Sequence, residues 1–323
     1  QRAGARCVGA GLHRGAAEPR SGARIVPTLE DLLALRGAAH GLSLHGRKAT
    51  RAALLGEHSS AQRGRGLEFQ EVRPYVAGDD PRNIDWRVTA RRGRPHTKLF
   101  REERERPVWL LVDLQPGLFF GTRRQLKSAL VVRAAALLAW IAALSGDRVG
   151  AVIADGRAEA RVLPARARQA GVLPLLQALL EAQPKSPAQP APLALEDGMR
   201  ALLPLARPGS QILALSDFAG LREEAGSLWT GLAAHCDLRL FWITDPLEEQ
   251  GLPNGRFRAG LPGRLSILDG ARIRERWRQA WTEREARLAA LSQRTATPVV
   301  RLGTGEAVEE VLRPLLRPRQ SAA

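Results

Sequence analysis

The hexapeptide VWLLVD, residues 108–113, is the first continuous apolar run of the chain, and it ends in an acidic residue. Five apolar residues without polar alternation are typical of a strand that is buried on both faces of a sheet. We therefore predict an α/β fold, a three-layer arrangement in which helices cover both faces of a mostly parallel sheet. Further strands are predicted at DRVGAVIAD (147–155) with a hairpin partner at 160–165, QILALSD (211–217), DLRLFWITD (237–245) and TPVVRL (297–302).

Helical patterns separate these apolar runs. Near the N-terminus, Thr28 and Asp31 have the spacing of a capping box, which predicts a helix that Gly37 ends. On the predicted helix 271–292, Trp277 and Trp281 are four residues apart among arginines. That pattern allows a nucleic-acid or membrane surface, but we expect the tryptophans to pack on the sheet. Helices are predicted over 125–144, 172–180, 193–205, 271–292 and 306–316, and an irregular segment over 256–270.

A charged block precedes the first apolar run: GRGLEFQEVRPYVAGDDPRNIDWRVTARRGRPHTKLFREERER, residues 64–106. A strand is predicted from Leu67, a helix start at Asp80-Pro81, and a second strand from Lys98. We predict that Ile84 and Trp86 anchor this block, and that it closes as a clasp onto the base or edge of the sheet. The carboxylates of Asp79, Asp80 and Asp85 could form a metal or catalytic site only if they converged and were not neutralised by nearby cations. Because several arginines lie close in the sequence, we expect these carboxylates to form ion pairs with them.

Composition and charge limit the possible functions. The 323 residues carry a formal net charge of +16, and lysine occurs only four times, so arginine supplies 45 of the 49 basic residues. Cys7 and Cys236 do not form a disulfide framework, which favours a reducing compartment, and we predict a cytoplasmic protein. The longest apolar run, 134–144, is shorter than the roughly 20 residues that span a bilayer. Residues 1–26 are predicted to be a disordered lead without a signal peptide.

The charged block and the strand that follows it closely resemble a bacterial family, domain of unknown function 58. The similarity continues through FGT (120–122) and GDRVGAVI (146–153) and covers about residues 55–220. The resemblance implies a von Willebrand factor A-like domain over 107–318, after a motif-bearing segment over 27–106. It also implies a MoxR-type AAA+ ATPase as partner, with an unknown client protein. The motif residues, predicted to bind a partner, are Gly66, Glu68, Phe69, Arg73, Tyr75, Gly78, Asp79, Asp80, Arg82, Ile84, Asp85, Trp86, Arg91 and Lys98.

Von Willebrand A-like domains often carry a metal-ion-dependent adhesion site with the pattern Asp-x-Ser-x-Ser. Here Asp113 matches the first position, whereas Gln115 and Gly117 replace the two serines. Asp217 matches the aspartate of a later loop, but the loop 184–192 lacks the expected threonine. Because Mg²⁺ prefers several oxygen ligands, we predict a degenerate site that needs no metal or other cofactor.

No motif for catalysis is found in the sequence. It contains neither a G-x-S-x-G nucleophile elbow nor a GxxxxGK[ST] phosphate loop, so we expect no hydrolysis of ATP by this chain. The predicted function is a non-enzymatic adaptor that works with the ATPase in the maturation of a protein or complex. Two alternatives remain open: a Mg²⁺-dependent ligand-binding domain centred on Asp113 and Asp217, and a basic protein that binds nucleic acid.

Overall fold

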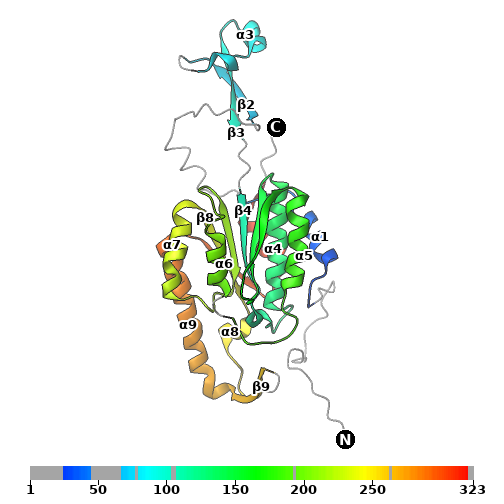
Figure 1. Ribbon diagram of the computed structural model, residues 1–323, viewed down its shortest axis with the longest axis vertical. Coiled ribbons are helices and arrows are strands. Elements are labelled where there is room, and N and C mark those ends of the chain that lie inside the picture. The colour runs from blue at the N-terminus through cyan, green and yellow to red at the C-terminus, as the bar shows by residue number, and fades with distance from the viewer. Residues whose placement is uncertain are drawn as a thin grey trace. The chain divides into compact units, whose positions relative to one another are not determined.

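The computed structural model describes residues 25–44, 67–76, 79–102, 107–191, 194–261 and 264–318 (Figure 1). The chain divides into two compact units. The smaller unit is Ala49–Glu105, and the larger one combines Gln1–Lys48 with Arg106–Ala323. Residues 1–24 of the predicted lead lie outside the described residues.

A six-stranded sheet forms the centre of the larger unit. Its order is β11-β8-β7-β4-β5-β6, and every neighbouring pair is parallel except β5 and β6. The first strand, β4, is central because the chain adds β5 and β6 on one side of it and β7, β8 and β11 on the other. The predicted mostly parallel sheet and the hairpin partner are confirmed. The strands are β4 (Pro107–Asp113), β5 (Arg148–Ala154), β6 (Arg161–Ala167), β7 (Gln211–Ser216), β8 (Asp237–Thr244) and β11 (Val299–Gly303).

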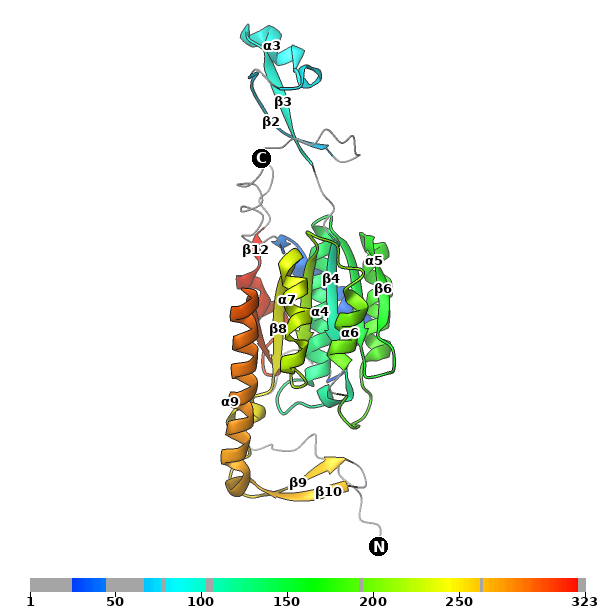
Figure 2. The ribbon, with the colours of Figure 1, turned by 60° about the vertical axis from the view of Figure 1, so that its left-hand side comes forward.

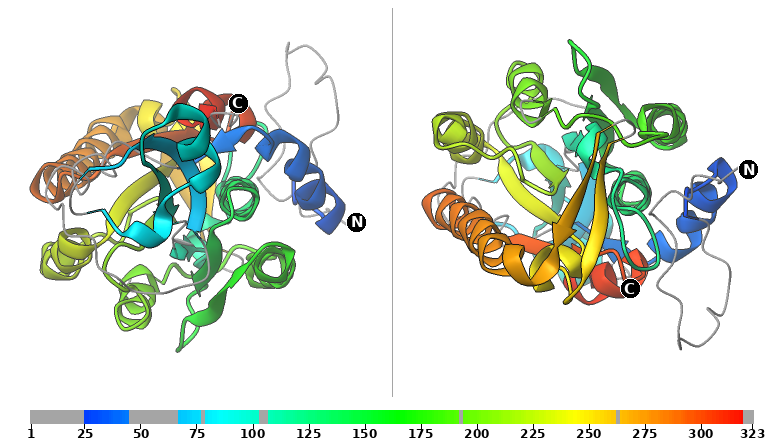
Figure 3. Two further views of the ribbon diagram at one scale, coloured as in Figure 1. Left: turned by 90° about the horizontal axis from the view of Figure 1, so that it is seen from above. Right: turned by 90° about the horizontal axis from the view of Figure 1, so that it is seen from below.

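Helices cover both faces of this sheet, as Figure 3 shows. One core cluster joins the sheet to α1, α4, α5 and α10, and a second joins it to α6, α7 and α9. The apolar α4 is almost wholly buried, because it lies between the sheet and α1. These helices are α1 (Leu29–Ala39), α4 (Lys127–Leu144), α5 (Gln169–Ala182), α6 (Ala194–Leu202), α7 (Gly226–His235), α9 (Gly270–Thr295) and α10 (Val308–Leu312).

The N-terminal helix belongs to the larger unit, which corrects the predicted boundary at residue 27. Its capping box is present, since Thr28 Oγ1 accepts from the Asp31 amide and Asp31 accepts from the Thr28 amide. The indole of Trp140 on α4 donates to the carbonyl oxygen of Leu32 at 3.0 Å. Gly37 does not end the helix, which continues to Ala39. After this helix, the two-residue strands β1 (Leu42–Ser43) and β12 (Arg317–Pro318) form an antiparallel pair.

Residues 256–269 form a hairpin, not the predicted irregular segment. The antiparallel strands β9 (Arg256–Leu261) and β10 (Arg264–Asp269) lead directly into α9 (Figure 2). The helix α7 is a further element that the sequence analysis did not predict. The remaining short elements are η2 (Pro116–Leu118), η3 (Glu223–Ala225), α8 (Pro246–Gln250) and η4 (Arg313–Leu315).

The smaller unit has its own two-stranded sheet. The antiparallel strands β2 (Leu67–Pro74) and β3 (His96–Glu102) pair with a bulge between Phe69 and Glu71. Between them lie the 3-10 helix η1 (Pro81–Asn83), capped by Asp80, and α3 (Trp86–Arg92), capped by Asp85. The predicted strands and the Asp80-Pro81 helix start are confirmed. The expected contact between this block and the larger sheet stays a prediction.

Trp86 does not act as an apolar anchor in the smaller unit, since 70% of its surface is exposed. Ile84 is half-buried and forms a bridge with Thr97. The neighbouring Asp85 accepts hydrogen bonds from the Arg87 and Val88 amides at 3.0 and 3.1 Å. The local structure therefore depends on the cap more than on the indole.

We predict that Asp85→Ala lowers the thermal midpoint of the smaller unit, because the first turn of α3 loses its side-chain acceptor. Trp86→Ala is expected to leave that midpoint unchanged, since little apolar surface is lost from the interior. Circular dichroism and hydrogen exchange of the full chain measure both effects. Equal destabilisation by the two substitutions would contradict this assignment.

Candidate functional site

The candidate site lies where the order of the sheet reverses, at the carboxyl ends of β4 and β7. In an open α/β sheet this position forms a natural crevice for ligands. Asp113 is the last residue of β4, and Asp217 directly follows β7. Both carboxyl groups are buried, so the structure brings together the two acidic residues that the sequence analysis selected.

The carboxylate of Asp113 is buried and accepts two hydrogen bonds. Its Oδ2 accepts from Ser216 Oγ at 2.6 Å, and its Oδ1 accepts from the Gln115 amide at 3.1 Å. Burial and the negative charge of Asp217 raise the pKa of Asp113 to about 7, although the two hydrogen bonds favour its charged form. Asp113 is therefore the easier of the two carboxyl groups to protonate near neutral pH.

Lys127, the first residue of α4, places its ammonium group between two carboxylates. Its Nζ donates to Asp217 Oδ2 at 2.5 Å and to Glu248 Oε1 at 2.9 Å. Only 2% of its side chain is exposed. Burial favours neutral lysine, but the charges of Asp217 and Glu248 raise its pKa above the ordinary value. The Asp217 pKa is lowered, because Lys127 outweighs the cost of burial. An ammonium ion thus compensates the carboxylate of Asp217.

Gln115 occupies a serine position of the adhesion-site pattern, and its amide oxygen is already used. Gln115 Oε1 accepts from the Gly117 amide and from the Ala191 amide, both at 2.9 Å. It thereby ties the loop after β4 to the loop that precedes α6. Gly117 permits this arrangement, because a Cβ there would lie 2.6 Å from Gln115 Nε2. The pair is a structural brace, and the side-chain oxygen of Gln115 already has two hydrogen-bond donors.

Glu248 connects the site to α8 and α9. Its Oε2 accepts from the Asp245 amide and completes a capping box at the start of α8. Its Oε1 contacts both Lys127 and Arg284, the latter at 3.2 Å from Nη1. Four charged groups from four segments therefore form one network: Asp217 after β7, Lys127 on α4, Glu248 on α8 and Arg284 on α9.

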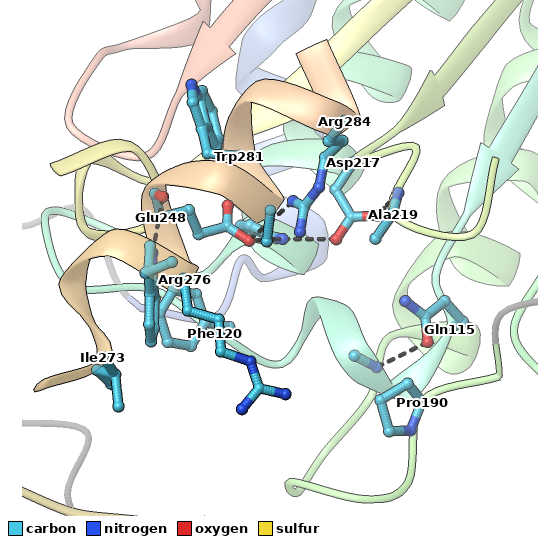
Figure 4. A pocket seen from close by; sticks show the side chains of 14 residues that line it. Gln115, Phe120, Pro190, Asp217, Ala219, Glu248, Ile273, Arg276, Trp281 and Arg284 are labelled. Atoms are coloured by element: carbon cyan, nitrogen blue, oxygen red, sulfur yellow. Dashed lines mark hydrogen bonds and ion pairs between the residues drawn. The ribbon is translucent and has the colours of Figure 1, made fainter. Parts of the chain in front are cut away.

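A pocket of about 570 Å³ opens beside this network (Figure 4). Phe120 and the α9 side chains Trp277 and Trp281 supply its aromatic wall. Trp281 stacks on Trp242 of β8 with a centroid distance of 5.0 Å, which confirms that this residue packs on the sheet. Arg276 and Arg284 also line the pocket, so the wall is both aromatic and basic.

The family-motif residues form a separate group in the smaller unit. Arg73 Nη2 lies 2.7 Å from Asp79 Oδ1, and the Tyr75 hydroxyl donates to the Asp79 carbonyl oxygen at 3.2 Å. Hydrogen bonding from the Val76 amide is the main reason that the Asp79 pKa is lowered. The expected Arg–Asp pairing is thus found at Arg73, whereas Asp80 and Asp85 serve as helix caps.

Other motif residues have different environments. Lys98 Nζ lies 3.5 Å from Asp85 Oδ2, while Arg82 and Arg91 are exposed. Glu68 and Phe69 lie on β2, and their side chains are not described. Gly66 and Gly78 lie outside the described residues.

The sequence analysis missed Lys127, Glu248 and Arg284. One signal for Lys127 was available: it is a rare lysine in an arginine-rich chain and begins an almost wholly apolar helix. Glu248 follows Asp245-Pro246 at capping-box spacing, which predicts its structural role but not its ion pair. Across the residues that the structure describes, no group of three or more His, Cys, Asp or Glu side chains is arranged to hold a metal ion.

A family model described as protein of unknown function DUF58 matches residues 71–287, which confirms the family resemblance. An uncharacterized protein of Mycobacterium bovis and two of Mycobacterium tuberculosis strains are each 41% identical over 132 residues. These alignments cover 41% of this chain and 41% of each relative, so the matched region spans less than half of their length.

Two solved structures match this chain at low sequence identity and low TM-score. The conserved hypothetical protein BatB from Bacteroides thetaiotaomicron is 14% identical with a TM-score of 0.39, covering 65% of this chain and 98% of its own. An aerotolerance-related membrane protein from Bacteroides fragilis is 13% identical with a TM-score of 0.41, covering 64% and 97%. Within the described part of this chain, α4 has the length and hydropathy of a membrane span, but 83% of that window is buried inside the fold.

Proposed function

We propose that this chain, which belongs to the DUF58 family of proteins of unknown function, is a non-enzymatic adaptor that binds its partner without a metal ion. The partner proposed is a MoxR-type AAA+ ATPase, and the complex would act on a client protein in the cytoplasm, where ATP is available. This role is consistent with the crevice at the carboxyl ends of β4 and β7. It is also consistent with the motif residues of the smaller unit, which act as helix caps and form ion pairs.

One observation carries the proposal: the ammonium group of Lys127 lies between Asp217 and Glu248. A carboxylate that already has a buried cationic partner gains less from a metal ion. The Gln115 oxygen is likewise used by two backbone amides. The crevice is therefore preorganised by protein groups, and its aromatic and basic wall suits recognition of another protein.

We further propose that the larger unit is von Willebrand factor A-like. The observed order, with the first strand central and an antiparallel strand at one edge, supports this assignment. So does the position of Asp113 and Asp217 at the two strands that flank the reversal. On this proposal, Lys127 provides the positive charge that a metal ion provides at an intact adhesion site.

The test is a binding assay between the full chain and a MoxR-type ATPase, with and without ATP. In the absence of nucleotide we expect association that is unchanged by EDTA or by added Mg²⁺, because the Lys127 ammonium supplies the charge. Arg276→Glu is expected to weaken binding at least tenfold, since it reverses a charge at the pocket wall, whereas Arg161→Glu on β6 is the matched control. No association in any nucleotide state would reject the adaptor role, and nucleotide-free binding that is abolished by EDTA would reject its metal independence.

A further inference from the structure

The hairpin β9–β10 exposes apolar and basic side chains on the same face. Leu265 and Ile267 alternate along β10, so they share a face, and their surfaces are 55% and 71% exposed. On β9, Arg258 lies directly opposite Ile267 and Gly260 opposite Leu265. Arg256 is on this face as well, and both arginines are exposed.

The opposite face of the hairpin differs. Its described apolar residues Phe257, Ala259 and Leu268 are each half-buried. Leu265 and Ile267 are therefore not turned toward the protein, as they would be in an ordinary amphipathic hairpin. Exposed apolar groups of this kind mark an interaction surface.

The charge around this face is strongly positive. Residues 254–278 contain seven arginines against two acidic residues, Asp269 and Glu275. Asp269 is occupied as the N-cap of α9, since its Oδ1 accepts from the Ala271 and Arg272 amides. Glu275 pairs with Arg278 at 3.3 Å. The acidic groups are thus used locally, and an excess of guanidinium groups remains.

We propose that this hairpin face, defined by Arg256, Arg258, Leu265 and Ile267, docks on an anionic lipid bilayer. The two aliphatic side chains enter the boundary between headgroups and acyl chains, and the flanking guanidinium groups contact lipid phosphates. The inference goes beyond the proposed adaptor function and does not depend on it.

The arrangement fits a bilayer better than nucleic acid or a protein groove. Nucleic acid would pair with the arginines but would leave Leu265 and Ile267 against phosphates and water. The hairpin reaches past the carboxyl ends of β4 and β8 in both side views (Figures 1 and 2). A projecting two-stranded element with an apolar ridge can enter a soft interface without a preformed cavity.

Co-sedimentation of the full chain with vesicles tests the proposal. We expect binding to vesicles of 30% phosphatidylglycerol in phosphatidylcholine, weakened by salt, and little binding to phosphatidylcholine alone. Ile267→Asp should reduce the affinity about tenfold or more, because it removes buried apolar area and adds a repelled charge. Arg256→Gln with Arg258→Gln should reduce it by about fivefold per arginine.

Val162→Asp on β6 is the matched control, since Val162 is 42% exposed and lies outside the β9–β10 hairpin. We expect unchanged vesicle binding for this variant, and unchanged melting temperature for all of them. Equal binding of wild type and Ile267→Asp to the anionic vesicles would overturn the proposal. The proposal would also be overturned if the wild type did not bind vesicles but bound duplex DNA or self-associated, and if Ile267→Asp abolished that interaction.

Discussion

Replacing Lys127 with methionine is expected to lower the free energy of unfolding of the larger unit by about 3–5 kcal/mol. The ammonium group is buried and bonded to Asp217 and Glu248. Without it, Asp217 remains in the interior with no cation at hydrogen-bonding distance. The hydrogen bond from the Ala219 amide stays, but it does not balance a full charge. Urea denaturation followed by circular dichroism measures the loss.

A second substitution separates the effect of the unpaired Asp217 charge from the effect of the changed side-chain shape at Lys127. Adding Asp217→Asn to Lys127→Met removes the unpaired negative charge, so we expect the double variant to be more stable than Lys127→Met alone. Arg161→Met is the control within the same unit, since the Arg161–Glu181 pair is exposed and should contribute little. A loss for Lys127→Met no larger than that of the control would show that the buried pair is not required. If Lys127→Met does not fold, recovery of folding in the double variant carries the same conclusion.

The sequence was sufficient to predict the sheet and the position of the acidic site. Uninterrupted apolar runs located the parallel strands, because a strand buried on both faces has no need for polar alternation. Asp113 and Asp217 were selected because they match the adhesion-site pattern of the family that the chain resembles. Each also ends a predicted strand, and parallel strands bring their carboxyl ends to one edge. The capping box of Thr28 and Asp31 was also predictable, because its two residues are only three positions apart and their spacing alone indicates the hydrogen bonds.

The partner of Asp217 was not predictable in the same way. Lys127 and Asp217 are 90 positions apart, and their contact depends on how α4 packs against the sheet. The hairpin β9–β10 was missed because its strands carry exposed apolar residues and lack the expected burial pattern. Trp86 was assigned to an interior by its residue type, whereas the two-stranded sheet of the smaller unit provides too little surface to cover it.

Substitution of Asp113 by asparagine is expected to stabilise the larger unit at pH 7.5–8. Burial and the charge of Asp217 raise the Asp113 pKa to about 7 from its ordinary value of 3.8. The folded state therefore holds the proton more tightly than the unfolded state, and stability falls as the pH rises from about 4 to 7. The full cost is on the order of 4 kcal/mol for a shift of this size, and asparagine removes it. Its Oδ1 can still accept from the Gln115 amide.

Thermal and urea unfolding of wild type and Asp113→Asn between pH 5 and pH 8 measure this effect. The wild type should lose stability as the pH rises through this window, and the variant should show a smaller loss. Asp245→Asn is a control of opposite sign: burial raises its pKa, but hydrogen bonds from Thr122 and Thr304 keep it below the ordinary value. That variant should be destabilised at every pH in the window.

The same measurement with Mg²⁺ decides between an ammonium-based site and a metal site. A metal ligand at Asp113 would be needed as a carboxylate, so added Mg²⁺ would stabilise the wild type and asparagine would abolish the gain. If the Lys127 ammonium instead balances the buried negative charge of Asp217, the reverse is expected. Mg²⁺ would then not change the stability, and Asp113→Asn would be more stable than the wild type at pH 8. Because the two models differ in the sign of the stability change, destabilisation by asparagine together with a Mg²⁺ response would overturn the metal-free assignment of the crevice.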